Sequence, residues 1–488
     1  MITKTFIGAV CILFLWLLTS RLKHVRARQA AVLAASYVFY ASWGLWFLPV
    51  LVVSSLVNYW LGGFLRSKPS AARLWLGVGA NLLLLGFFKY MPSAARIAAA
   101  SYLMNRLGHL ALPLGISFWT FQAMSYLFDL CREKEIDPSL LEFCLYMAFF
   151  PTVVSGPICR MGELLPQFRR GVTLNWLDFA SGVRRISVGL VMMSAAFLLG
   201  NGLRSGAGLN TAFNQSTSRW SFPDAWCLAI GYGFLLFFDF AGYSHVVIGI
   251  ARLFGIELRE NFNRPYLATS ISSFWTRWHM SLSFWIRDYV FVPLATSNSA
   301  SSWRHFSLFI SMVVFGLWHG AKWTFLLWGA FQGTLLVLHR LWQEAQRRFG
   351  FAWTGLALDF ISWIMTFASV SVGWVLFRAE SVHQAISLLK GLISIGSLHS
   401  SSLPRSLYLL VFFFALGYFA VGGVSILLDR ISEPEAENTT SSFRSLWEVL
   451  SRERWVWATP LTLIIALYLR LLMQTQQAVA SPLLYRLF

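Results

Sequence analysis

The chain has 488 residues, of which 57% are hydrophobic and only 12% are charged, about half the charged fraction of a soluble globular protein. Aromatic side chains make up 17% of the chain and include 23 Trp residues, which suits lipid-facing helices anchored by rings at the headgroup level. The composition therefore excludes a soluble enzyme and a peripheral membrane protein, and it predicts an all-α chain that crosses a membrane many times.

The charge of the chain is strongly basic, because 39 Lys and Arg residues stand against 21 Asp and Glu residues and give a net charge of +18. On a soluble protein such an excess would indicate a nucleic-acid partner. Here the basic residues occupy short loops between apolar runs, as the positive-inside rule for membrane proteins describes. We therefore expect membrane lipid, and no nucleic acid, as the partner. Five scattered Cys residues lack paired spacing and predict neither a metal site nor a disulfide framework.

Apolar runs follow one another along the chain without an internal repeat. A spanning helix needs about 20 predominantly apolar residues, because lipid offers no hydrogen-bond partner to an exposed backbone. The runs predict about 11–13 membrane helices and re-entrant segments, all within a single membrane domain at residues 1–488. The expected segments are residues 5–20, 30–47, 49–65, 73–90, 113–130, 141–157, 183–203, 224–254 (long enough for two short helices), 306–340, 353–377, 405–428 and 456–476.

A conspicuous block of polar and ionisable residues interrupts the apolar pattern at residues 237–294. Its part from Phe274 to Val290 has helical spacing, with polar residues falling largely off the apolar face. Such a segment is either an amphipathic helix in the interface, with its arginines reaching toward water, or part of the wall of a wet cavity. The apolar face consists of Phe274, Trp278, Leu282, Trp285 and Tyr289, and the polar residues are Arg277, His279, Ser283 and Arg287.

The segment at residues 306–340 is too long for one ordinary span, and His319 lies in it between two apolar halves. Gly316 and Gly320 flank this histidine, so we expect two half-length elements that meet near His319 and line a cavity. A lone buried histidine is often only a hydrogen-bonded structural residue. Small neighbours, however, would let a ligand approach it closely, and a neutral imidazole suits general-base work on a hydroxyl.

At this point the sequence resembles a known family. Two stretches, WHGAKWTFLLWG at residues 318–329 and FWTRWHMSLSFWIRDYVFVPL at residues 274–294, are similar to motifs of the membrane-bound O-acyltransferase family. Its bacterial branch includes the membrane subunits for alginate, cellulose and peptidoglycan O-acetylation and the teichoic-acid D-alanylation protein. Further similar stretches follow in order along nearly the whole chain: SYVFYASWG (36–44), NLLLLGFFKY (81–90), LPLGISFWTFQAMSYLFD (112–129), FFPTVVSGPICR (149–160) and VSVGWVLFRAESVHQAI (370–386).

The resemblance implies a ring of membrane helices around a buried reaction chamber, with a signature core at about residues 112–340. It implies that His319 is the active-site histidine and that His279, 40 residues earlier, is the second polar position of the site. Trp278, Trp318, Gly316, Gly320 and Arg277 are expected to line the chamber. Arg287 and Lys322 are candidates for binding donor phosphates at its mouth.

The alginate-type branch fits best, with one departure. An acidic residue is expected after GYS, where this chain has His245. A histidine cannot supply the same permanent negative charge, so His245 is either a third chamber residue or, in the reading we favour, structural. The implied activity is acetyl transfer from acetyl-coenzyme A, as a substrate rather than a bound cofactor, towards a cell-envelope glycan. An extracytoplasmic partner acetyltransferase would complete the transfer. The implied location is the bacterial inner membrane.

Two alternatives stay open. Within the family, the acceptor could instead be a lipid, teichoic acid, a protein or a small metabolite. Outside it, a transporter or flippase would equally contain broken helices and buried ionisable groups. The absence of visible repeat symmetry in the sequence favours the enzyme. No Gly-x-Ser-x-Gly motif suggests a serine nucleophile.

Overall fold

The computed structural model describes residues 2–98, 111–132, 136–170, 176–204, 206–215, 220–350, 355–398 and 400–431. Within these ranges the chain forms helices joined by short loops, and none of the described residues is in a strand. This confirms the all-α prediction. The predicted segment at residues 456–476 lies outside the described residues.

The N-terminal half contributes helices of very different length. They are α1 (Ile2–Arg21), α2 (Val25–Ala41), α3 (Phe47–Ser67), α4 (Ala71–Ala98), α6 (Ile116–Arg132), α7 (Leu140–Ala148), α8 (Met161–Arg170), α9 (Trp176–Asn201), α10 (Leu209–Phe213) and α11 (Phe222–Leu253). The predicted segment at residues 141–157 is helical only as far as Ala148, so α7 is too short to span a membrane. The run at residues 224–254 forms one continuous helix, α11, rather than two.

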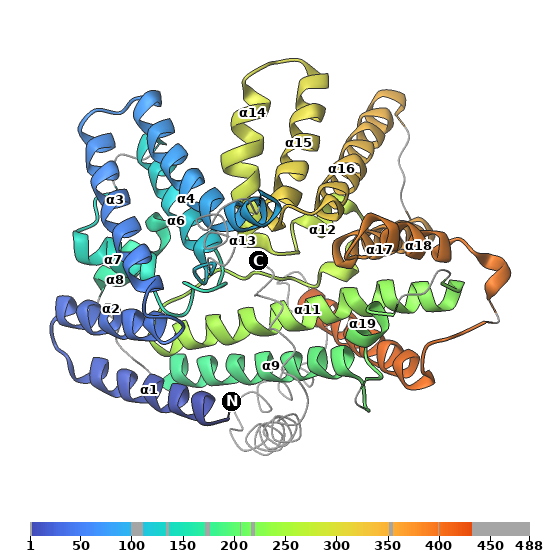
Figure 1. Cartoon of the computed structure of the whole chain (residues 1–488), viewed down its shortest axis with the longest axis horizontal. Coiled ribbons are helices and arrows are strands. Elements are labelled where there is room, and N and C mark those ends of the chain that lie inside the picture. The colour runs from blue at the N-terminus through green and yellow to red at the C-terminus, as the bar shows by residue number, and fades with distance from the viewer. Residues whose placement is uncertain are drawn as a thin grey trace.

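The C-terminal half begins with short, irregular elements and continues with long helices. They are η1 (Pro265–Leu267), α12 (Ile271–Trp275), α13 (Met280–Ile286), the π-helical η2 (Arg287–Phe291), α14 (Val292–Thr296), α15 (Ser301–His319), α16 (Trp323–Phe349), α17 (Leu356–Arg378), α18 (Val382–Leu392), η3 (Ile395–Ser397) and α19 (Arg405–Ile431). Figure 1 shows the long helices arranged around the short α12 and α13 near the middle of the molecule.

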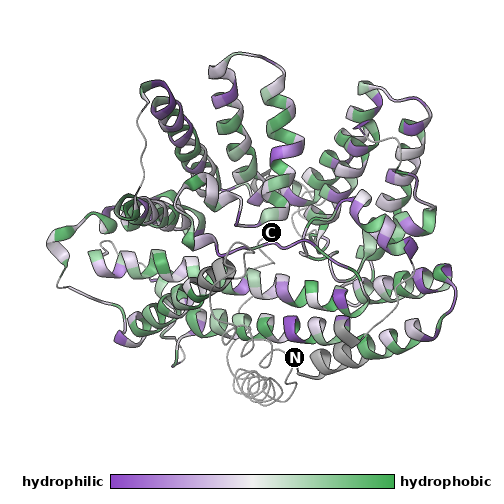
Figure 2. Ribbon diagram, turned by 180° about the vertical axis from the view of Figure 1, so that it is seen from behind, coloured by the Kyte–Doolittle hydropathy of each residue, from purple (hydrophilic) through white to green (hydrophobic). Residues whose placement is uncertain are grey.

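Six of the described helices are long and apolar enough to cross a membrane. They are α3, α4, α9, α11, α17 and α19. Figure 2 shows that hydrophobic residues occupy much of the length of the helices. Many large apolar side chains, such as Trp60 and Leu83, are exposed, while polar Asn58 and Asn81 are buried and bond to each other. This inverted distribution is that of a multi-pass integral membrane protein.

The longest helix, α11, lies side by side with α9 (Figure 1), and glycines at two levels let their backbones touch. A methyl group on Gly189 would lie 2.5 Å from the carbonyl oxygen of Gly242, and one on Gly242 would lie 2.8 Å from that of Gly189. Gly182 and Gly249 repeat the arrangement at 2.7 Å in both directions. Small residues at such contacts allow the close van der Waals packing that holds membrane helices together.

The predicted interruption near His319 is present, since α15 ends at His319 and α16 begins at Trp323. The two elements are not half-length, because they extend beyond residues 306–340 to 19 and 27 residues. Gly316 and Gly329 face each other across the pair: a methyl group on Gly316 would lie 3.1 Å from the α-carbon of Gly329. The glycine therefore serves the contact between the two helices.

The prediction of one continuous helix from Phe274 to Val290 is wrong, although all five residues of its predicted apolar face are buried. The helix breaks between α12 and α13, where His279 adopts φ 41° and ψ 54°. Two backbone bonds hold this turn against the preceding loop: Asn263 N–H donates to Arg277 O, and Met280 N–H to Asn261 O, each at 2.9 Å. A left-handed conformation is costly for a residue other than glycine, so the surrounding structure must enforce it.

The glycine contact between α9 and α11 can be tested with a single methyl group. Gly242→Ala should push the helices apart and lower the stability by about 1–3 kcal/mol, as overpacking of a tight contact does. The measurement is the melting temperature of the purified protein in detergent. Gly86→Ala is the matched control, because a methyl group there meets nothing within 4 Å. Equal melting temperatures for the two variants would show that this contact does not limit stability.

Candidate active site

A small cavity lies where α6, α11, α15, α16, α17 and the turn before α13 meet. Its volume of about 20 Å³ is room for roughly one water molecule. Aromatic rings form most of the wall, and two histidines are the only titratable side chains among the lining residues. The wall consists of Phe118, Leu236, Phe240, Trp278, His279, Phe315, Trp318, His319, Trp328, Trp374 and Phe377.

His319 reaches the cavity from the C-terminal end of α15. The helix stops there because Gly320 continues in an extended conformation, with φ 167° and ψ 170°. Only 6% of His319 is exposed. Its imidazole lies among aromatic rings, with centroid distances of 4.9 Å to Phe377, 5.2 Å to Phe315 and 5.3 Å to Trp328. This packing fixes the position of the ring in a site from which bulk water is excluded.

His279 reaches the same cavity from the strained turn and is 3% exposed. Its Nδ1 lies 3.1 Å from Oδ1 of Asn261. That oxygen also accepts hydrogen bonds from the backbone N–H of Ser281 at 3.2 Å and from the Ser281 hydroxyl at 2.9 Å. Because a backbone N–H can only donate, Oδ1 must be the acceptor, and His279 Nδ1 must therefore carry a proton. In the neutral ring the lone pair is then on Nε2.

Asn261 is the residue that holds His279 in this state. It is fully buried, and its amide nitrogen donates to the hydroxyl of Ser244 on α11 at 3.2 Å. The same residue thus anchors the turn to α11 through its side chain and to Met280 through its carbonyl oxygen. Sequence reasoning missed Asn261, since nothing in the pattern of a loop asparagine indicates which side chain it will contact.

A second residue that sequence reasoning missed is Lys89, on α4. Its ammonium group donates to the backbone carbonyl of Trp318 and lies 5.0 Å from the centroid of the Trp318 ring. The neighbouring Tyr90 hydroxyl donates to the carbonyl of Leu317 at 2.7 Å. The last carbonyls of α15 are thereby satisfied next to His319. A lysine inside an apolar run was the available signal, because such residues usually mark functional regions of membrane proteins.

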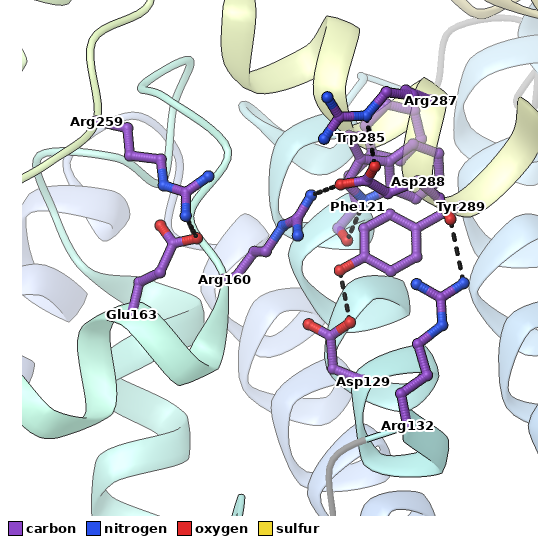
Figure 3. Close-up of polar contacts among 10 residues, drawn as sticks. All are labelled: Phe121, Asp129, Arg132, Arg160, Glu163, Arg259, Trp285, Arg287, Asp288 and Tyr289. Atoms are coloured by element: carbon purple, nitrogen blue, oxygen red, sulfur yellow. Dashed lines mark hydrogen bonds and ion pairs between the residues drawn. The ribbon is translucent and has the colours of Figure 1, made fainter. Parts of the chain in front are cut away.

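Behind the cavity, a polar network fixes η2 to α6 and to the loop before α8 (Figure 3). Tyr289 donates to Asp129 at 2.7 Å, and Asp288 pairs with both Arg160 and Arg287. Burial raises the pKa of the Asp288 carboxyl, but the hydrogen bonds from the two arginines outweigh it and hold this pKa below its ordinary value. Asp288 therefore stays ionised at neutral pH.

The network also positions the wall of the cavity. Trp285, just before η2, donates its ring N–H to the carbonyl of Phe121 at 3.1 Å (Figure 3). Its ring stacks on that of Phe121 at a centroid distance of 4.1 Å, and Phe121 in turn stacks on Trp318 at 5.4 Å. A row of aromatic rings thus connects the ionic network with the residue adjacent to His319.

The structure brings together four of the predicted site residues, namely His279, His319, Trp278 and Trp318. The other six lie outside the cavity lining: Gly316, Gly320, Arg277, Arg287, Lys322 and His245. Gly316 contacts α16, as described above, and a methyl group on Gly320 would meet the ring of Phe325. Sequence reasoning missed the remaining aromatic wall, although Trp328, Trp374 and Phe377 belong to stretches that carry the family resemblance.

The four polar residues outside the lining have separate environments. Arg277 is half-buried, and its carbonyl takes part in the turn. Arg287 is exposed and bound to Asp288, and Lys322 is exposed at the start of α16. His245 lies near the ion pair formed by Arg185 and Glu260.

The sequence of the chain is similar to those of known proteins. A sequence model of the membrane-bound O-acyltransferase family matches residues 102–376. The chain is 35% identical over 395 residues to a probable alginate O-acetylase of Pseudomonas putida, covering 78% of each chain. It is 33% identical to the peptidoglycan O-acetyltransferase of Helicobacter pylori, over 76% of this chain and 75% of that protein. It is 28% identical to a teichoic acid D-alanyltransferase of Bacillus subtilis, over 55% and 69% respectively.

The role of Asn261 in holding His279 can be measured. Asn261→Ala removes the acceptor that fixes the ring, and we expect a loss of about 10- to 100-fold in turnover, as for other residues that orient a functional histidine. Ser244→Ala is the control, because it removes a partner of the Asn261 amide and leaves the bond to His279 in place. Full turnover of Asn261→Ala in a properly inserted protein would contradict this role.

Proposed function

Because the chain belongs to the membrane-bound O-acyltransferase family, we propose that it transfers acetyl groups from acetyl-coenzyme A towards a cell-envelope polysaccharide. The protein is a membrane O-acyltransferase. The polysaccharide acceptor is supported by similarity to an alginate O-acetylase and a peptidoglycan O-acetyltransferase. We further propose that acetyl-coenzyme A is the donor, that the protein lies in the bacterial inner membrane, and that residues 1–488 form one functional domain.

The observation that carries the proposal is the meeting of His279 and His319 at one enclosed cavity. Both are buried, and they come from different helices. Acyl transfer to an alcohol needs a group that takes the hydroxyl proton, and a neutral imidazole is well suited to this. In our mechanism His319 takes that proton while the hydroxyl oxygen attacks the thioester carbonyl carbon. The carbon–sulfur bond then breaks, and the thiolate recovers the proton as the free thiol.

The hydrogen bond to Asn261 limits the roles that His279 can take in this mechanism. Its Nδ1–H is committed to Asn261, so in the neutral ring Nε2 accepts a hydrogen bond and cannot donate one. This fits a residue that orients the acceptor hydroxyl or shares its proton. It does not fit the role of donor to a developing oxyanion.

The dimensions of the cavity add a condition. A space for roughly one water molecule does not hold a thioester and an alcohol together, so aromatic side chains must move when substrates bind. A closed resting cavity also protects a reactive thioester from hydrolysis. Arg287 and Lys322, both exposed, remain our candidates for binding the phosphates of the coenzyme outside the cavity. If the glycan does not receive the acetyl group directly from this protein, a separate extracytoplasmic acetyltransferase would accept it and complete the transfer.

The central test replaces the proposed base. His319→Ala should reduce acyl transfer by about 10²- to 10⁴-fold, the usual contribution of a general base, while the protein still inserts into the membrane. Turnover is measured with labelled acetyl donor, membrane insertion by recovery of the variant in the membrane fraction, and folding by size-exclusion chromatography in detergent. His339→Ala on α16 is the control, because His339 is outside the cavity lining. Near-normal turnover of His319→Ala would remove this residue from the mechanism.

The donor is tested separately. We expect detergent-purified protein to bind labelled acetyl-coenzyme A saturably and to hydrolyse it slowly, because water can take the place of the acceptor hydroxyl when no acceptor is present. Free coenzyme should compete for binding. If the protein instead binds an acylated carrier protein and not the coenzyme, the acetyl-coenzyme A part of the proposal is wrong and the chain belongs functionally with the D-alanyltransferases. Substrate export without acyl transfer would favour a transporter.

A further inference from the structure

Three polar ring atoms in the wall of the cavity are buried without a hydrogen-bond partner among the described residues. They are Nε2 of His279, Nε1 of Trp328 and Nε1 of Trp374. Buried donors and acceptors in native proteins are nearly always paired, so each such atom requires an explanation. His279 Nε2 is an acceptor, whereas an indole nitrogen carries a hydrogen and can only donate.

Of the two indoles, Trp328 has the fewer alternatives. The ring nitrogen of Trp374 lies beside the hydroxyl of Tyr266, which offers it an acceptor oxygen. Around Trp328 the neighbours are rings: Trp275, Phe315 and Phe377, with centroid distances of 5.9, 5.5 and 5.2 Å. None of these three residues can accept a conventional hydrogen bond through its side chain. His319 also lies beside Trp328, but no hydrogen bond joins the indole nitrogen to any described residue, so a ligand in the cavity could supply the acceptor.

The position of Trp328 relative to His319 is well defined. Trp328 lies on α16, nine residues after His319, and only 1% of it is exposed. The two rings are nearly perpendicular, at 84°, with a centroid distance of 5.3 Å. The close contact between α15 and α16 at Gly316 and Gly329 sets this relationship. The indole therefore forms a fixed wall beside the histidine.

We propose that the indole N–H of Trp328 donates a hydrogen bond to the acyl oxygen of the thioester and stabilises the oxyanion formed when the hydroxyl attacks. This inference rests on the proposed acyl transfer. As the new carbon–oxygen bond forms, the carbonyl π electrons move onto the acyl oxygen. They return when the carbon–sulfur bond breaks and the thiolate leaves. A fixed dipole in a site without bulk water stabilises such a transient charge strongly, because it needs no reorganisation during the reaction.

The composition of the cavity supports this role, because the indoles are the only side-chain donors among its lining residues besides the two histidines. His279 Nε2 accepts in the neutral ring, and His319 is occupied with the proton of the attacking hydroxyl in the proposed mechanism. The remaining lining residues are apolar apart from the indoles. An indole N–H does not titrate in the physiological range, so its contribution is independent of pH. Trp328 is thus assigned a catalytic role distinct from that of either histidine.

Trp328→Phe tests the assignment, because it removes the N–H and keeps an aromatic ring in the wall. We expect kcat to fall by about 10²- to 10³-fold, the usual cost of losing one oxyanion donor, with little change in the KM for acetyl donor. Trp275→Phe is the matched control. Its ring nitrogen is also buried without a partner and its ring contacts Trp328, but Trp275 does not line the cavity. It should retain the kcat of the unmodified protein.

A second variant separates hydrogen bonding from shape. Replacing Trp328 with 2-naphthylalanine keeps a bicyclic ring without the N–H and should lose kcat to the same extent. Full kcat in either Trp328 variant would overturn the assignment, as would a loss confined to KM. These outcomes are distinct from failure of the proposed function. If the unmodified protein transfers no acetyl group, the proposed function is wrong. Activity that depends on His319 but not on Trp328 refutes only the role of Trp328.

Discussion

A chain that leaves helical geometry inside a membrane protein must satisfy its backbone groups within the protein, because lipid supplies no partners. The candidate site consists of two such departures. At the first, the loop before η1 bonds to the turn around His279 through Asn261 and Asn263. At the second, side chains of Lys89 and Tyr90 take the last carbonyls of α15. Each break presents one histidine to the same cavity, so the bonds that make the breaks tolerable also determine where the imidazoles lie.

The rest of the molecule holds these two breaks in register. The contact of α15 with α16 sets the position of His319 against Trp328, and the glycine contacts of α9 with α11 hold the helix that carries Ser244, a partner of Asn261. The ionic network around Asp288 acts on the opposite wall through the stacked rings of Trp285 and Phe121 (Figure 3). Large rings fill space without adding charged groups, so few polar atoms remain in the wall of the cavity.

Sequence alone predicted the all-helical membrane fold, the interruption beside His319 and the burial of the apolar face from Phe274 to Tyr289. It did not predict the turn at His279, because the spacing of the buried residues continues through the break as though the helix were intact. Gly316 was assigned to the cavity because small residues serve both ligand approach and helix contact, and only coordinates distinguish the two. Trp328 could not be singled out, since most of the 23 Trp residues have equal claim to be lipid anchors.

The small aromatic cavity also bears on how an acceptor is selected under the proposed function. Reading a particular sugar requires several directed hydrogen bonds, because a missing hydroxyl is rejected strongly only where the site would leave polar groups unpaired. Apart from the two histidines and the indoles, the wall here has no side chains that can form such bonds. In the proposed reaction, the closed lining offers polar partners for an acyl group and one hydroxyl and none for the rest of a glycan. Under the proposed function, acceptor selection falls to residues outside this lining. Relatives of the chain carry alginate, peptidoglycan and teichoic acid in their names.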